Sequence, residues 1–174
     1  INNAMTELVR RGFTAKQTLG SMPAILNASR ASGEDLGVVM QATASSIEMF
    51  GLKANTTAEQ IKNTNRVTDV LTVAANKTAS SFADISAAMT YVGPTAAQAH
   101  MSIEQIAAAI GALSNRGIEA STAGTTLRQV LSKLTTDTKA NRANMRAIGV
   151  DIDEIKKKGV DLPKLIDQIN NKLK

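Results

Sequence analysis

Residues 101–114 read MSIEQIAAAIGALS, and this stretch shows the pattern that decides the fold. Ser102 and Gln105 have the spacing of a capping box, in which two side chains satisfy free backbone amides at a helix start, and Ser81 with Asp84 is a close variant elsewhere in the chain. The apolar residues that follow recur at the i, i+3, i+4, i+7 spacing of one helix face: Ile103, Ile106, Ala107, Ile110 and Leu113. The stretch therefore predicts an amphipathic helix with one buried face.

The same periodicity runs through most of the chain, and no convincing run of alternating β-branched residues appears. Glycines stand where the stripes stop, as is usual just after a helix end. Pro94 disfavours a helical residue before it, so a break is expected at Gly93-Pro94, and a second near Pro23. The predicted helices are 2–11, 14–31, 34–50, 58–76, 82–92, 95–100, 103–116, 120–135, 138–148, 152–158 and 162–173. Short amphipathic helices must bury their stripes against each other, so we expect a compact all-α domain.

The composition excludes several classes of site. The chain has 174 residues, of which 43% are apolar and 2% aromatic, enough for a core without disulfides. It has no Cys and one His, which excludes a thiolate zinc site and a cysteine nucleophile, and disfavours histidine-based metal or acid–base chemistry. No phosphate loop or catalytic motif is present. We therefore expect no enzymatic activity, no catalytic or metal-binding residues and no cofactor.

Positive charge gathers near the end of the chain. The net charge is +5, and residues 133–174 hold ten of the twenty basic residues but six of the fifteen acidic ones. We expect residues 1–135 to form the helical domain and residues 136–174 a basic helical extension. Lys156, Lys157 and Lys158 are its candidate electrostatic contact, to nucleic acid or to an acidic protein surface. A solvated helix face explains the same charges. The chain begins at Ile1 rather than Met, and we expect it to be a piece of a longer protein.

Ala123-Gly124 interrupts a predicted helix with a residue that disfavours helices. Glycine in a helix interior costs about 1 kcal/mol relative to alanine, and close approach of another helix would offset this. Ala123, Gly124, Thr125, Leu127 and Arg128 are therefore the candidate helix-packing motif, with Arg128 placed one turn on to reach a helix end or a carboxylate.

Residues 115–128, NRGIEASTAGTTLR, resemble the signature of bacteriophage tail tape measure proteins in their minor-tail core region. Supporting matches occur in the family order over about residues 4–135. They are Arg11-Gly12-Phe13-Thr14, Phe50-Gly51-Leu52, Val70-Leu71, residues 74–78 and Tyr91-Val92-Gly93-Pro94.

The resemblance implies a structural role in the virion tail. Tape measure proteins are long helical proteins of the tail lumen; they set tail length during assembly and leave the tube ahead of the DNA. It also implies assembly in the host cytoplasm. The implied partners are the tail tube protein, tail-tip or baseplate proteins, tail assembly chaperones and further copies of the chain, with a transient DNA contact and no small-molecule substrate. The glycine breaks make this segment a folded module rather than the ruler shaft, and no catalytic residue is carried over.

Three other functions remain open from the residues alone. A helical protein-interaction adaptor with no phage role explains the caps and stripes but not the Ala123–Arg128 signature. A nucleic-acid contact through the basic last quarter is the second. A helical hydrolase is the third, and nothing in the sequence supports it.

Overall fold

The computed structural model describes residues 2–173, which form helices joined by short turns, with no strand among them. The helical prediction is confirmed. The bounds of the ten helices in this part of the chain are α1 Asn2–Arg10, α2 Ala15–Ser32, α3 Leu36–Met49, α4 Thr57–Lys77, α5 Phe82–Gln98, α6 Ile103–Ser114, α7 Ala120–Thr135, α8 Lys139–Ala147, α9 Ile152–Lys158 and α10 Leu162–Leu173.

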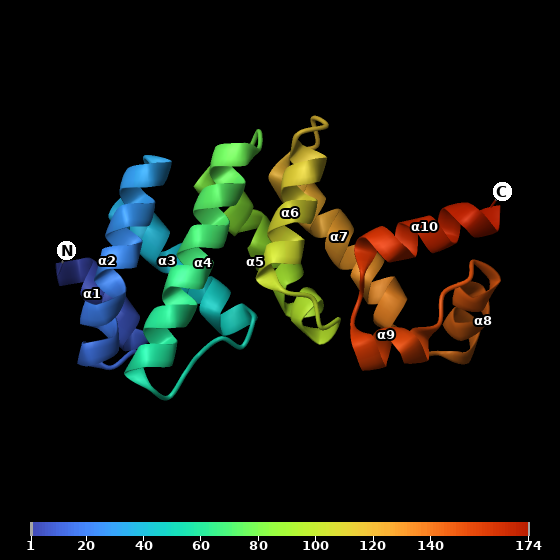
Figure 1. Ribbon diagram of the computed structural model, residues 1–174, viewed down its shortest axis with the longest axis horizontal. Coiled ribbons are helices and arrows are strands. Elements are labelled where there is room, and N and C mark those ends of the chain that lie inside the picture. The colour runs from blue at the N-terminus through green and yellow to red at the C-terminus, as the bar shows by residue number, and fades with distance from the viewer. Residues whose placement is uncertain (1, 174) are drawn as a thin grey trace.

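Helices α2 to α7 form three helical hairpins stacked side by side, as Figure 1 shows. Helices α2, α4 and α6 make the front layer, and α3, α5 and α7 lie behind them. Each helix packs both on its partner within the hairpin and on the corresponding helix of the next hairpin. Helix α1 covers the first hairpin, and α8, α9 and α10 lie at the opposite end (Figure 1). One continuous apolar cluster runs through the whole stack.

Three helices begin with the same side-chain device. Thr14, Ser81 and Ser102 each accept a hydrogen bond from the backbone N–H three residues on, and the side chain of that later residue accepts from the cap's own N–H. The capping boxes expected from the sequence at Ser81 and Ser102 are therefore confirmed.

Five helix ends share a second device, a left-handed residue followed by an apolar one, which is buried or half-buried in every case except Ile118. Four of the left-handed residues are glycines, Gly12, Gly51, Gly117 and Gly149, and the fifth is His100, with φ 53°. After each, the next N–H donates to the carbonyl five residues back, as Met101 does to Ala96 at 2.9 Å. This hydrogen bond satisfies a carbonyl group that has no partner within the last turn of the helix. Sequence reasoning expected glycines here and missed His100, because residues other than glycine seldom adopt a positive φ. Histidine, like Asn and Asp, adopts this conformation more often than other non-glycine residues do.

Both expected proline breaks are wrong. Helix α2 continues through Pro23, and α5 continues through Gly93-Pro94. A proline inside a helix removes one backbone hydrogen bond and crowds the preceding turn. In α5 the residue before it is glycine, which has no Cβ to clash with the proline ring. Val92 and Ala96, on either side, are fully buried. Tertiary packing therefore holds the helix together where local preference would end it.

Candidate interaction surfaces

The candidate helix-packing motif lies in the first half of α7, on the side that faces α5. Ala123, Gly124 and Leu127 are buried there. A Cβ added to Gly124 would lie 2.5 Å from the Ala88 carbonyl oxygen and 3.0 Å from the Ala88 Cα. The two backbones therefore meet at Gly124 with no room for a side chain, and α5 and α7 make the most extensive helix–helix contact of the fold.

The other two motif residues, Thr125 and Arg128, are not among the buried residues of α7. Thr125 lines a hollow of about 260 Å³ together with Tyr91 and three further hydroxyl residues, Ser121, Thr122 and Thr126. Arg128 is exposed, and within the described part of the chain no carboxylate forms an ion pair with it. The structure thus divides the motif between a packing side and a solvent side, and it does not bring Arg128 to a partner.

The three candidate lysines differ in their surroundings. Lys156 forms an ion pair with Asp137, and Lys158 Nζ lies 3.2 Å from Glu154 Oε1. Hydrogen bonds from Arg142 and from Lys156 hold the pKa of Asp137 well below its usual range. Lys157 is exposed and has no described partner. Lys156 and Lys158 are therefore paired with carboxylates of the same segment, whereas the ammonium group of Lys157 is exposed and available to bind another molecule.

Sequence reasoning missed the ion pairs that join separate helices. Arg66 of α4 donates two hydrogen bonds to the Glu104 carboxylate of α6, from Nε to Oε1 at 2.6 Å and from Nη2 to Oε2 at 2.8 Å. This hydrogen bonding lowers the pKa of Glu104 to about 2. Arg11 binds Glu48 at 3.0 Å and so joins the end of α1 to α3. No local sequence signal identifies such pairs, because the partners lie more than thirty residues apart.

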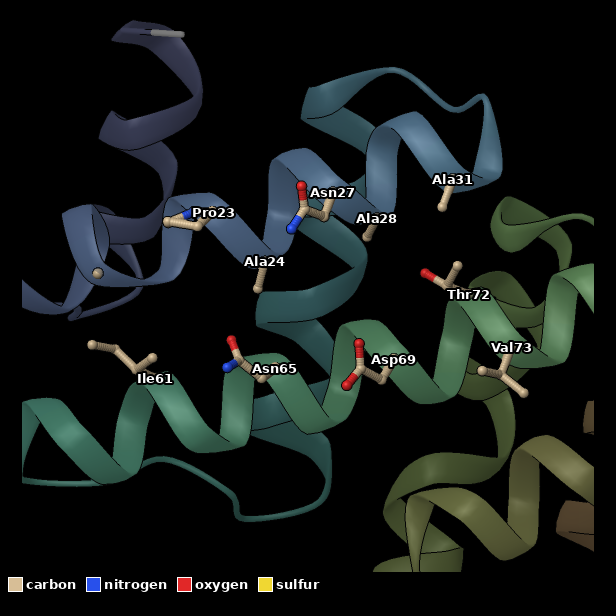
Figure 2. A pocket seen from close by; sticks show the side chains of 11 residues that line it. Pro23, Ala24, Asn27, Ala28, Ala31, Ile61, Asn65, Asp69, Thr72 and Val73 are labelled. Carbon is tan, nitrogen blue, oxygen red and sulfur yellow. The ribbon is translucent and has the colours of Figure 1, made fainter.

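A groove of about 640 Å³ runs between α2 and α4 (Figure 2). Its α2 wall is built mainly from small residues, including Ala24, Ala28 and Ala31. Its α4 wall carries Asn65 and Asp69, whose side chains rise toward α2 in Figure 2. Asp69 is the one ionisable residue of this lining, so the groove has no pair of groups for acid–base chemistry. The described residues also contain no cluster of His, Asp and Glu that could hold a metal ion.

The family model for phage-related minor tail proteins matches residues 1–174. The chain belongs to this family. Among its relatives, the tape measure protein of Pneumococcus phage Dp-1 is 35% identical over 165 residues, which is 95% of this chain and 14% of that protein. The probable tape measure protein of Escherichia phage P2 is 38% identical over 110 residues, 62% of this chain and 13% of that protein. The chain thus spans about a seventh of these relatives, and no solved structure matches it.

In this minor tail protein, the stretches that carry the family resemblance lie at packing points. Phe13 follows the left-handed Gly12 and is buried. Phe50 lies at the end of α3, close to Gly93 of α5, where an added Cβ would be 3.6 Å from its ring. The stretches quoted for the resemblance therefore include residues that position helices, and residues from two of these stretches also line the hollow beside Tyr91.

Proposed function

We propose that this segment is a folded structural module of a phage tail tape measure protein. The observation that carries the proposal is the stacked-hairpin fold of this segment, most of whose residues align with a tape measure protein. A continuous helix of 174 residues would span about 260 Å, since each residue adds about 1.5 Å. Folded into short stacked helices, these residues contribute little length. The module is therefore carried on the ruler, and other parts of the parent protein set the tail length.

The same proposal places the parent protein in the lumen of the tail tube, after assembly in the host cytoplasm. There it supports tail assembly and leaves the tube ahead of the DNA. The surfaces of this segment include helix faces, a hollow beside Tyr91 and a groove with a single ionisable residue, Asp69, which suits contacts with proteins. The partners we propose are the tail tube protein, tail-tip or baseplate proteins, the assembly chaperones and other copies of the chain. The similarity to tape measure proteins favours this function over that of an adaptor with no phage role.

Tail length in deletion mutants tests the proposal. One mutant lacks this 174-residue segment of the parent protein, and a second lacks an equal number of residues from a predicted continuous helix elsewhere in it. We expect the second deletion to shorten tails in proportion and the first to give absent or misassembled tails, both scored by electron microscopy. Tails shortened equally by both deletions would show that the segment acts as ruler shaft.

A further inference from the structure

The three helices after α7 form an electrostatically closed unit, which we name the C-terminal cap, residues 136–173. Every described ion pair that involves one of its residues has both partners inside it. These pairs are Arg142 with Asp137 and Asp153, Lys156 with Asp137, and Lys158 and Lys164 with Glu154. The Asn141 side chain donates one hydrogen bond inside the cap, to the Thr136 carbonyl at 2.7 Å, and one outside it, to the Lys133 carbonyl of α7 at 2.7 Å. Movement of the cap as a whole would therefore break none of its ion pairs.

Besides the Asn141–Lys133 hydrogen bond, the cap is attached to the hairpin stack in two ways. Helix α9 packs on α7, and apolar residues of the cap, Val150, Ile155, Val160 and Leu165, belong to the continuous core cluster. In addition, the Val160 N–H donates a hydrogen bond to the Ala99 carbonyl at 3.1 Å. Among the described residues this is the main-chain hydrogen bond that joins the end of α9 to the turn between α5 and α6. The attachment thus depends on these apolar contacts, one main-chain hydrogen bond and the Asn141–Lys133 hydrogen bond.

That backbone contact requires glycine at position 159. Gly159 has φ 80° and ψ 175°, a conformation adopted almost solely by glycine. An added Cβ would lie 2.9 Å from the His100 carbonyl oxygen and 3.0 Å from the His100 Cβ. His100 itself holds a left-handed conformation. Two unusual backbone conformations therefore meet where the cap is fastened to the stack.

We propose that the C-terminal cap is a hinged cover, fastened at Gly159–Val160, which opens as one unit about residues 136–138 while the hairpin stack stays folded. Opening breaks the hydrogen bonds of Val160 to Ala99 and of Asn141 to Lys133, and it uncovers the apolar surface between α9 and α7. It leaves the ion pairs of the cap and the α5–α7 crossing intact. Local opening of this kind costs less free energy than global unfolding, because fewer buried contacts are lost. The cover therefore controls whether this end of the stack is exposed.

Hydrogen exchange measured by mass spectrometry on the intact chain tests this device. Amides of α9 and α10 are expected to exchange at least about tenfold faster than those of α4 and α5 under native conditions. Gly159→Ala is expected to raise exchange in α9 and α10 further and to leave α4 and α5 unchanged. The matched control is Gly33→Ala, where φ is also positive, 74°, but no atom lies within 4 Å of the added Cβ.

A second variant covers the case in which Gly159→Ala fails to fold. Val160→Ala shortens a buried anchor of the cap and should raise exchange in the same helices, whereas Val130→Ala, at an exposed position of α7, should not. Equal exchange rates in the cap and the stack, raised together by these variants, would show a single unfolding unit and overturn the proposal. So would exchange in the cap that neither variant alters. The outcome does not depend on a role in phage tails, so it is separate from the test of the proposed function.

Discussion

At the residue scale, Gly124 decides how closely α7 can approach α5. Its nearest non-local neighbours are backbone atoms of Ala88, which cannot turn aside as a side chain can. Ala88 is fully buried, so α5 cannot move without disturbing the core around it. The cost of glycine in a helix is offset here by the contact that its missing side chain permits.

We expect Gly124→Ala to lower the free energy of unfolding by about 1–2 kcal/mol. The alanine gains about 1 kcal/mol of helix propensity, but forcing an extra carbon against backbone atoms that cannot rotate away costs about 2–3 kcal/mol, the upper part of the usual range for overpacking. Gly124→Leu should cost more for the same reason. Urea unfolding followed by circular dichroism measures the difference, and an unchanged or higher midpoint would contradict the packing role.

Gly20→Ala is the matched control, since Gly20 also lies inside a helix. The added Cβ would meet two side-chain atoms of the half-buried Ile61, Cδ1 and, at 2.9 Å, Cγ1, and a side chain can shift where the Ala88 backbone cannot. We expect the free energy of unfolding to stay unchanged or to rise by up to about 1 kcal/mol. The pair of variants separates helix propensity from the contact with Ala88.

At the element scale, the sequence predicted best what local interactions decide. Apolar stripes, capping boxes at Ser81 and Ser102 and glycines at helix ends all depend on neighbours within a few residues, and the helices agree with them closely. The missed features depend on distant partners. Arg66 pairs with a residue on another helix, and α5 passes through Pro94 because Val92 and Ala96 are buried in the stack. The groove between α2 and α4 likewise exists only once both helices are placed.

Pro94 gives a prediction at this scale. Its ring is exposed, so it contributes little packing, while it removes a backbone hydrogen bond from the middle of α5. We expect Pro94→Ala to raise the free energy of unfolding by about 1–3 kcal/mol, because alanine restores the N–H and removes the ring clash. Thermal unfolding followed at 222 nm measures the change.

Pro163→Ala is the corresponding control, because Pro163 lies in the first turn of α10, where an N–H has no partner within the helix. This change should leave the free energy of unfolding nearly unaltered. If Pro94→Ala proved equally neutral or destabilising, the proline would be needed for the path of α5 rather than tolerated by it.

At the scale of the whole molecule, the hairpin stack and the C-terminal cap present different surfaces to a partner. The stack balances its charges, and residues 1–132 hold ten basic and nine acidic side chains. The cap holds the basic excess but pairs much of it internally, through Arg142, Lys156, Lys158 and Lys164. A partner attracted to the cap therefore meets fewer open cations than the sequence suggests, and Lys157 is one of them.

Charge reversal at Lys157 is consequently the cleanest test of the electrostatic contact that we propose for the cap. Lys157→Glu changes an exposed residue without a described ion pair, so it should alter the free energy of unfolding by less than about 0.5 kcal/mol. We expect it to reduce the yield of tailed particles from a phage that carries it in the parent protein. Reversal of Lys156, Lys157 and Lys158 together should reduce the yield more, because single exposed charges contribute little. That triple change also breaks the ion pairs with Asp137 and Glu154, so the free energy of unfolding of the triple variant must be measured as well.

The control is Lys16→Glu, which makes the same substitution at an exposed position of α2 in the stack and should leave assembly intact. Normal yields from both Lys157→Glu and the triple variant would show that the cap's lysines are solvated and that the module binds through its uncharged helix faces instead.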